Sequence, residues 1–561
     1  MNNNSNDNKY SKKNHNKLVI SESKFATFSK NFYRRHFKGI SPMRQILLWY
    51  FFITIVGTAF LMTPWVLKEG IENPGFIDSL FMSSSAFSDT GLTTLNIYDT
   101  YNWFGEFVLL VLIEIGGIGW FAIKIFALLF FVKKIKFSES SQAGYEKGSG
   151  DFNITMGVIK IAVIVTIGVT IIFGFIFGII FATIEPVNLA SNYIVLDLGD
   201  GNSLYYFGPE DLLLTTDPSE LQEYFAVLPT DMVGLQGNWW GSFKTGIFHA
   251  GASINNSGLD VFAGNYSLAG YYSNYGIETI TVSLFILGGI GFGVIYDCVV
   301  YVKHRATGQT FKFSLVTKVS VVSYALVAIS GLGLVFLFEG LSTISNETNS
   351  AFLINDENGT MFARIYAIGF NTFSTRNAGF STTDISAFST SSQFIFILMM
   401  FIGSGPGSTA GGIRTTTFFV LILSTWTQMR GKENINIYKR TIPKKESKSA
   451  RNTFFFSLII ILFTALIILS AEEISLKTSS IGDSVYSGEI NGLLDVLFVT
   501  TSAFGTTGLS PVSLDDATVV SKMMLILMMF LGKMGMGATI SQFASKNPKD
   551  PSYMEETLNI G

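Results

Sequence analysis

The sequence predicts an all-α polytopic membrane protein with four tandem repeats around a central pore, each repeat a span, a short pore helix and a second span. Three observations lead to this fold class. Only 14% of the 561 residues are charged, whereas an ordinary globular domain has about 25%. Apolar runs long enough to cross a bilayer recur along the chain, and a short motif ending in glycine recurs between them. These features predict eight transmembrane helices and four re-entrant pore loops.

The composition excludes several classes of protein. The net charge of -3 gives no strong positive field, so we expect no nucleic-acid partner. The one cysteine, Cys298, excludes a disulfide framework and a cysteine-rich metal site. The histidines His15, His36, His249 and His304 lie far apart and offer little material for a metal cluster, although folding could bring some together. We expect no organic cofactor on this chain.

The apolar runs define the predicted spans. A hydrocarbon core of about 30 Å needs roughly 20 apolar residues in a helix. Residues 1–40 are polar and basic ahead of the first run, which argues against a cleavable signal peptide. The predicted spans cover residues 45–65, 103–132, 154–184, 277–302, 314–338, 392–424, 452–471 and 521–545.

The distribution of lysine and arginine predicts the orientation of these spans. Basic clusters lie in the first 40 residues and after the second, fourth and sixth spans, at 133–136, 303–305 and 430–448. The insert at 185–243 carries nine acidic residues and no lysine or arginine. Since basic residues favour the cytoplasmic side, we predict a multi-pass protein of the cell membrane with both termini in the cytoplasm.

The short pore segment is repeated most clearly in the first and last copies. Asp78–Leu92 reads DSLFMSSSAFSDTGL and Asp495–Leu509 reads DVLFVTTSAFGTTGL, and they match at nine positions. The second copy, Thr245–Leu259, and the third, Tyr366–Phe380, are weaker but keep a small residue, glycine and Leu or Phe at the end. A glycine-rich landmark follows each copy inside the next span, at 115–119, 287–293, 402–407 and 531–537.

The repeats give a predicted domain organisation for the whole chain. It comprises a cytoplasmic tail at 1–42, repeat 1 at 43–136, repeat 2 at 150–305 with an acidic extracellular insert at 185–243, repeat 3 at 312–430 with a broken helix at 403–412, a cytoplasmic basic loop at 431–450, repeat 4 at 451–545 and a cytoplasmic tail at 546–561.

Glycine turns at membrane depth have a physical use. Non-helical backbone is tolerated there only where it is buried in protein or lines a watered cavity. Four such turns facing a common axis could present backbone carbonyls that replace the hydration shell of a cation. Glycine permits the backbone angles that this requires. The alternative, ordinary re-entrant loops or helix-packing sites, would be favoured for one loop but not for four with matched glycines.

The four endings SDTGL, NNSGL, RNAGF and GTTGL resemble the filter loops of the Trk/Ktr/HKT superfamily of potassium transporters, most closely the bacterial Ktr/Trk pore-forming subunits. The likeness covers residues 43–545. It implies potassium uptake through a four-loop selectivity filter. Within that family, glycine at the key position of all four loops goes with K+, whereas serine in the first loop goes with Na+. A Na+-selective or Na+/K+ transporter of the same fold is the alternative.

The resemblance also implies which residues form the filter. K+ would be held by backbone carbonyls at the four key glycines and their neighbours. The candidate filter residues are Asp89, Thr90, Gly91, Asn256, Ser257, Gly258, Asn377, Ala378, Gly379, Thr506, Thr507 and Gly508.

The sixth predicted span is interrupted by GSGPGSTAGG, followed by Arg414. Glycine and proline at this density cannot hold a regular helix, and the hydroxyl side chains suit a wet lining. The family carries its intramembrane gate loop at this place, so the resemblance implies a gate below the filter. A kink for packing would explain one proline but not the whole run. The candidate gate residues are Gly403, Ser404, Gly405, Pro406, Gly407, Ser408, Thr409, Gly411, Gly412 and Lys533.

Three charged residues stand near these elements. Lys533 lies within the last span, where a cation is costly unless it is functional or paired. The hypothesis is an electrostatic barrier to flux, and the alternative is a salt bridge with Glu106, Glu114 or another carboxylate. Asp89 would concentrate cations if it faced the outer vestibule, or pair with a neighbouring base if it faced away. Arg376 places a charge beside the third turn.

A polytopic membrane enzyme is the rival from another class. It would need clustered carboxylates or histidines, and the spans contain few of either, scattered singly. The resemblance further implies a homodimer and a cytoplasmic nucleotide-binding regulatory subunit of the RCK type. It implies K+ as the transported ion. Na+, either as a second ion or as a symport partner, is left open.

Overall fold

The computed structural model describes residues 42–131, 152–184, 186, 194–197, 203–206, 235–262, 267–272, 274–345, 361–479 and 492–536. Helices dominate these residues, and the strands form only two short hairpins. Nearly all of the predicted tail 1–42, the tail 546–561 and most of the predicted insert 185–243 lie outside the described residues. The predicted α-helical class is confirmed at this level.

Among the described residues, four single helices are long and apolar enough to cross a membrane. Each carries large apolar side chains on its outer face: on one of them, Ile164 is 62% exposed and Ile172 60%. Such continuous apolar surface suits lipid rather than water. The four helices are α2 (Pro42–Leu61), α8 (Phe152–Thr183), α13 (Leu315–Ser345) and α18 (Lys444–Ser479).

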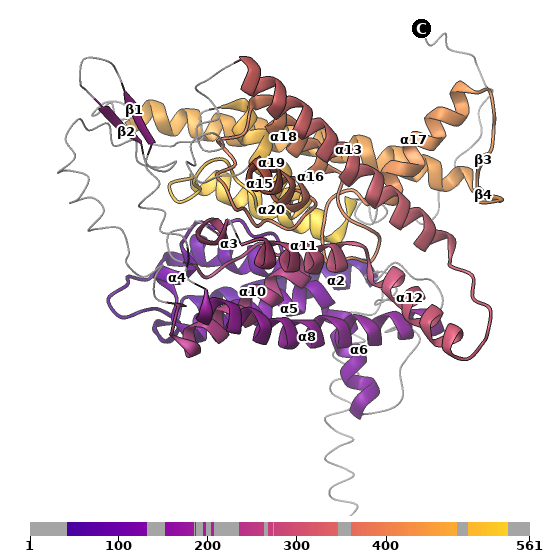
Figure 1. Cartoon of the computed structure of the whole chain (residues 1–561), viewed down its shortest axis with the longest axis horizontal. Coiled ribbons are helices and arrows are strands. Elements are labelled where there is room, and N and C mark those ends of the chain that lie inside the picture. Colours follow the sequence, from indigo (N-terminus) through magenta and orange to yellow (C-terminus); the bar gives the residue numbers. More distant parts are fainter. Residues whose placement is uncertain are drawn as a thin grey trace, which may run out of the picture.

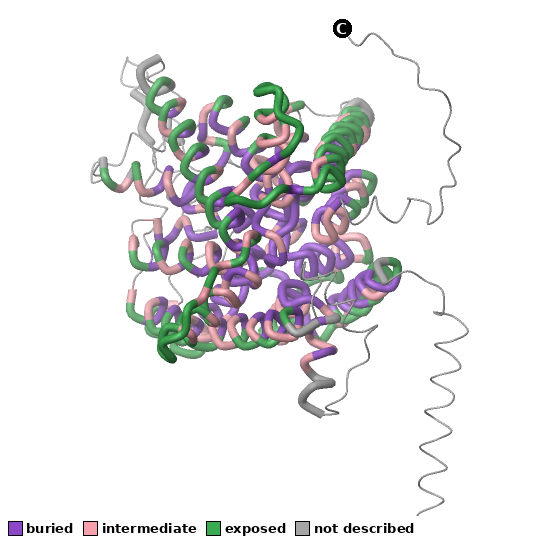
Figure 2. Tube along the Cα trace, turned by 90° about the vertical axis from the view of Figure 1, so that its right-hand side faces the viewer, coloured by how far each residue is buried: buried purple, intermediate pink, exposed green. Residues whose placement is uncertain are grey.

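Four shorter helices follow the long ones, where the pore segments are predicted. In Figure 1, α8 lies on one side of the molecule and α13 and α18 lie on the opposite side, with the shorter helices between them. Buried residues accordingly concentrate in the centre of the molecule in Figure 2. The shorter helices are α3 (Gly75–Ser88), α10 (Trp239–Asn255), α15 (Met361–Ser374) and α19 (Leu493–Gly505).

The spans predicted at 103–132 and 277–302 are each divided into two helices in the structure. Glycines with positive φ stand at the breaks in these two spans, Gly119 at 91° and Gly291 at 100°. Gly535, at 81°, ends the helix in the span predicted at 521–545. The axis turns by 97° between α11 and α12. The resulting helices are α5 (Trp103–Ile118), α6 (Trp120–Phe131), α11 (Tyr275–Gly289), α12 (Phe292–Ala306), α16 (Thr390–Phe401), α17 (Thr415–Met429) and α20 (Val519–Met534).

The remaining elements are short. The predicted insert 185–243 includes a hairpin of β1 (Ile194–Asp197) and β2 (Ser203–Tyr206), and its last residues belong to α10, which begins at Trp239. A second hairpin, β3 (Ile435–Ile437) and β4 (Arg440–Ile442), lies in the predicted basic loop 431–450. Single turns complete the described chain at η1 (Pro64–Val66), α4 (Ile97–Thr100) and η5 (Ala269–Tyr271).

The hydrophobic core joins the first repeat to the last. One buried cluster contains Phe81 of α3 and Leu92 together with Ile461 of α18, Phe504 of α19 and Leu525 of α20. Other clusters link the first, second and third repeats, and the third with the fourth. Because each repeat packs on its neighbours in a closed order, the ends of the four shorter helices are brought together.

Candidate functional site at four glycine turns

Each of the four shorter helices leads into a non-glycine residue in the left-handed conformation. The φ angles are 52° at Asp89, 57° at Asn256, 66° at Asn377 and 51° at Thr506. Asparagine, aspartate and a few others tolerate this conformation at helix ends. All four side chains are fully buried. The structure therefore places these predicted site residues at one equivalent position in the four repeats.

Backbone hydrogen bonds close three of these helix ends in the same way. The N–H of Asp89 donates to Ala86 at 3.2 Å, and the N–H of Thr90 donates to Ser85 at 2.9 Å. The second and fourth repeats show the same two bonds. This is the Schellman arrangement, in which a left-handed residue satisfies the last carbonyls of a helix. The third turn is looser, because α15 ends at Ser374 and the N–H of Ala378 donates to Ser374 at 2.9 Å.

Two residues after each left-handed residue stands one of the predicted filter glycines. The φ angles are 92° at Gly91, 69° at Gly258, 82° at Gly379 and 95° at Gly508. A side chain is strained at such angles. In all four repeats a left-handed residue is followed two positions later by a glycine with positive φ, and together they turn the backbone sharply. The positive φ at the second position is what requires glycine there.

The four glycines lie against one another in a closed ring. A Cβ added to Gly258 would meet Gly379 Cα at 2.8 Å, and one added to Gly508 would meet Gly91 Cα at 2.9 Å. A Cβ at Gly91 would meet Gly258 Cα at 3.1 Å, and one at Gly379 would meet the Thr507 carbonyl. The order is thus first, second, third, fourth and back to first. We call these residues the glycine ring.

Each ring glycine faces the carbonyl oxygen that precedes the next ring glycine. The oxygens of Ser257, Ala378, Thr507 and Thr90 are the atoms that a Cβ would meet at Gly91, Gly258, Gly379 and Gly508 respectively. Four carbonyl oxygens from four repeats are therefore gathered in one place. Oxygen groups of this kind can coordinate a dehydrated monovalent cation.

The glycine landmarks allow the second helices to approach the turns closely. A Cβ at Gly116 would collide with the Phe87 carbonyl, and one at Gly288 with the Ile254 carbonyl. Gly532 stands in the same relation to Phe504. Any larger residue would push the helix off the turn, which gives the landmark glycines a packing role.

The broken segment 403–412 contacts the left-handed residues of three turns directly. Thr409 Oγ1 donates to Asn256 Oδ1 at 3.1 Å, and Ser404 Oγ donates to Asn377 Oδ1 at 3.2 Å. The N–H of Gly411 donates to Thr506 Oγ1 at 2.7 Å. The predicted gate residues therefore lie directly beside the predicted filter residues.

The other face of the broken segment rests on the bend between α11 and α12. The N–H of Gly405 donates to the Gly289 carbonyl at 2.9 Å, and the N–H of Phe292 donates to the Gly407 carbonyl at 3.4 Å. A Cβ at Gly291 would meet the Pro406 carbonyl at 2.5 Å. The remaining predicted gate residues, Gly403, Ser408 and Gly412, lie in the same segment between α16 and α17.

Lys533 connects the broken segment with the first turn. Its Nζ donates to the Thr409 carbonyl at 2.6 Å and forms an ion pair with Asp89. The two side chains are 7% and 0% exposed. Of the alternatives weighed from the sequence, Asp89 thus pairs with a base, and the carboxylate that Lys533 contacts is neither Glu106 nor Glu114.

Two arginines hold the ends of the broken segment. Arg376 is fully buried and donates to the carbonyls of Met399 at 3.0 Å and Gly403 at 2.9 Å, and to that of Ile402. Its guanidinium also lies 5.0 Å from the Tyr324 ring. Arg414 donates to Ser408 Oγ at 3.1 Å and to the Ala410 carbonyl at 2.5 Å. The sequence shows the charge of Arg376 beside the third turn but does not indicate these carbonyl contacts.

Two further ion pairs were not foreseen from the sequence. Glu106 of α5 pairs with Lys244 of α10 at 2.8 Å, and Lys522 of α20 pairs with Asp78 of α3 at 2.7 Å. Glu106 and Lys522 are each the fourth residue after a helix N-cap. Aligning the second helices of the repeats from their N-caps shows that Glu106 and Lys522 hold equivalent positions, but it does not identify their partners.

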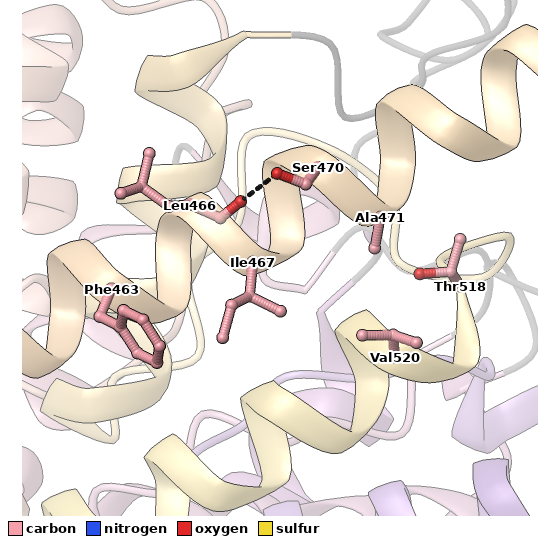
Figure 3. Close-up of a pocket in the computed structure, with 7 residues that line it drawn as sticks. All are labelled: Phe463, Leu466, Ile467, Ser470, Ala471, Thr518 and Val520. Carbon is pink, nitrogen blue, oxygen red and sulfur yellow. Dashed lines mark hydrogen bonds between the residues drawn. The ribbon is translucent and has the colours of Figure 1, made fainter.

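Other features lie apart from these turns. His249 packs its ring against Phe177 at 4.7 Å and Phe380 at 4.9 Å. An open apolar groove of about 640 Å³ lies between α18 and α20 on the outer surface (Figure 3). It is lined by Phe463, Leu466, Ile467, Ser470, Ala471, Thr518 and Val520 and carries no charged group.

Known proteins resemble this chain over nearly its whole length. A potassium/sodium uptake protein of Enterococcus hirae is 28% identical over 93% of this chain and 98% of its own length. The Ktr system potassium uptake protein D of Bacillus subtilis is 27% identical over 89% and 92%. An uncharacterized cation transporter of Mycoplasma genitalium is 29% identical over 93% and 98%.

A solved structure shares the fold. The potassium transporter TrkH from Vibrio parahaemolyticus superposes with a TM-score of 0.57 over 91% of this chain and 87% of its own, at 15% identity. The TrkH family of cation transport proteins matches residues 52–554. The predicted superfamily is confirmed, and with it a transport protein rather than an enzyme. The apolar helices and these matches establish a multi-pass membrane protein, and the chain belongs to the TrkH family of cation transport proteins.

Proposed function

We propose that this protein takes up K+ across the cell membrane through a selectivity filter formed by the glycine ring. The observation that carries the proposal is the closed order of the four glycines, each facing a carbonyl oxygen from the next repeat. Relatives named as potassium uptake proteins support K+ as the ion. Carbonyls at Gly91, Gly258, Gly379 and Gly508, with those of the residues before them, replace the water around K+.

We propose for this function the architecture expected from the sequence. Eight spans and four pore helices form four repeats around the pore, with both termini in the cytoplasm. The helices α3, α10, α15 and α19 direct their carbonyl ends toward the turns, and these ends carry partial negative charge that favours a cation. The proposed domain bounds remain those given above, with α10 beginning at Trp239. A homodimer and a cytoplasmic RCK-type subunit complete the proposed assembly.

The broken segment is the proposed gate. In the described arrangement its hydroxyls and one N–H bond to the turns through Thr409, Ser404 and Gly411. Ions passing the filter would meet this segment next. Opening therefore requires these bonds to break and the segment to move aside, and its glycines allow such a change of backbone.

Lys533 has two proposed effects on flux. Its charge, placed beside the first turn, opposes a passing cation, and its bond to the Thr409 carbonyl holds the gate closed. The ion pair with Asp89 reduces the first effect, because the carboxylate partly cancels the charge. We therefore propose that Lys533 acts mainly by holding the broken segment through the Thr409 carbonyl.

A K+/Na+ transporter is the second candidate, since one relative is named a potassium/sodium uptake protein. Competitive flux in proteoliposomes that contain the purified protein decides between the two. The proposal expects K+ to enter faster than Na+ when both are present. Na+ entering as fast as K+ would establish the second candidate, and no protein-dependent flux of either ion would overturn both.

A further inference from the structure

Two carboxyl groups lie on one face of α5, directed toward α10. Glu106 and Glu114 are eight residues apart, a spacing that keeps side chains on the same stripe of a helix. Glu106 is ion-paired with Lys244 of α10 at 2.8 Å, so its negative charge is balanced. Glu114 has a different environment, about two turns further along α5.

The contacts of Glu114 are made with neutral groups. Thr170 of α8 donates to Glu114 Oε1 at 2.7 Å. Oε2 is buried and has no hydrogen-bond partner among the described residues. The side chain of Asn255, the last residue of α10, lies within hydrogen-bonding reach of the carboxyl.

The charged and titratable groups of α10 and of the first turn are engaged elsewhere. On α10, Lys244 bonds to Glu106, and His249 bonds through Nε2 to Thr281 at 3.0 Å. Beyond α3, Asp89 is paired with Lys533. No cation among the described residues therefore balances a charge on Glu114. An ionised carboxylate without such a partner is very costly inside a membrane protein.

Asn255 has a side-chain oxygen, Oδ1, that accepts no hydrogen bond among the described residues. Its amide group donates to the Gly251 carbonyl at 3.0 Å, while its Oδ1 is buried without a donor among the described residues. Glu114 Oε2 and Asn255 Oδ1 are thus two buried oxygens that cannot bond to each other as they stand. A proton on Glu114 would supply a donor, and an O–H bond from Glu114 to Asn255 Oδ1 would then satisfy both atoms.

We propose that Glu114 is a proton-binding site behind the second turn, holding one proton and donating it in a hydrogen bond to Asn255. Asn255 directly precedes the filter residues Asn256, Ser257 and Gly258. Loss of the proton would break this bond and put a negative charge behind the turn. Ion flux should therefore change when Glu114 ionises, a consequence that rests on the proposed function, whereas the protonation itself does not.

Infrared spectroscopy of the purified protein tests the protonation directly. The spectrum of the wild type minus that of Glu114→Gln at neutral pH should contain the carbonyl stretch of a protonated carboxylic acid. Glu106→Gln is the matched control, since it removes an ion-paired carboxyl from the same helix face and its difference spectrum should contain only carboxylate bands. If Glu114→Gln does not fold, Glu114→Asp should shift the acid band instead. A difference spectrum for position 114 with carboxylate bands alone would overturn the proposal.

A flux measurement tests the consequence for transport. For the wild type and for Glu114→Gln, the measured quantity is the ratio of the K+ uptake rate at alkaline pH to the rate at neutral pH. This ratio should fall below one in the wild type, as Glu114 loses its proton, and stay near one in Glu114→Gln, which cannot ionise. An equal fall in both would remove Glu114 as its cause. Because the infrared result does not depend on transport, failure of the proton site and failure of the transport proposal are distinguishable.

Discussion

Lys533 and Asp89 form a buried ion pair across 444 residues of sequence, between the last helix of the fourth repeat and the turn of the first. Lys533 also donates to the Thr409 carbonyl at 2.6 Å. One side chain thus contacts the first turn and the broken segment together. The other three turns contact that segment without an intermediary, through Thr409, Ser404 and Gly411.

Replacing Lys533 with Ala should raise basal K+ uptake and lower stability. The Thr409 carbonyl loses its donor, and the buried Asp89 loses its ion pair with Lys533, which costs about 3–5 kcal/mol. Uptake and thermal unfolding are both measured. Adding Asp89→Asn should recover part of the stability while uptake stays high. Lys444→Ala is the control, because that lysine pairs with Glu433 on the exposed surface. Unchanged uptake kinetics in Lys533→Ala would argue against both proposed effects of Lys533.

Thr409→Val should also raise basal uptake, by a different route. Valine has the shape of threonine but cannot donate to Asn256, so one bond between the gate and the second turn disappears. Thr425→Val, on the exposed side of α17, removes a hydroxyl that bonds only within its own helix. Uptake through proteoliposomes should rise for the first variant and not the second. Equal uptake in the two would remove this bond from the mechanism.

Arg376→Lys should destabilise the protein although the charge is kept. Lysine has no planar fork with which to reach several carbonyls, and it cannot stack in the same way on Tyr324. Each lost hydrogen bond to a charged group costs about 1.5–3 kcal/mol. Thermal unfolding in detergent should show a clear fall in Tm. A wild-type Tm would mean that the contacts with Met399 and Gly403 contribute little.

Asp260 should make stability depend on pH. It lies after the second turn and outside the spans, and burial raises its pKa from 3.8 to about 6. The folded protein then binds more protons than the unfolded chain between these values, so stability falls as pH rises through that window. Asp260→Asn cannot ionise and should gain Tm relative to the wild type as pH rises from 3.8 to 6, with no further gain above. A constant Tm difference would refute the shift.

Most residues of the candidate site could be predicted from the sequence because glycine is the residue that readily adopts a positive φ. The positive φ at Gly91, Gly258, Gly379 and Gly508 needs a residue without a side chain, so the requirement is visible at each position. The broken segment 403–412 could be recognised for the same reason. Repetition placed the four turns together, since one repeated unit tends to make the same contacts in each copy.

Contacts between residues distant in sequence could not be predicted in the same way. Nothing local in the sequence relates Lys533 to Asp89, or Arg376 to the carbonyls at the end of α16. The span predicted at 103–132 was placed by its hydropathy, which does not register that Gly119 ends one helix and starts another. Side-chain partners depend on how whole helices pack, and a single sequence does not contain that information directly.

Competitive uptake of K+ and Na+ by Gly91→Ser is the sharpest test of a selectivity filter at the glycine ring. A serine there is strained at a φ of 92°, and its Cβ would meet the second turn at Ser257 and Gly258. Gly70→Ser is the matched control, with a φ of 85° and nothing within 4 Å of the new Cβ. We predict that the preference for K+ over Na+ falls in Gly91→Ser and is kept in Gly70→Ser. Unchanged selectivity in a folded Gly91→Ser protein would contradict a filter at the glycine ring.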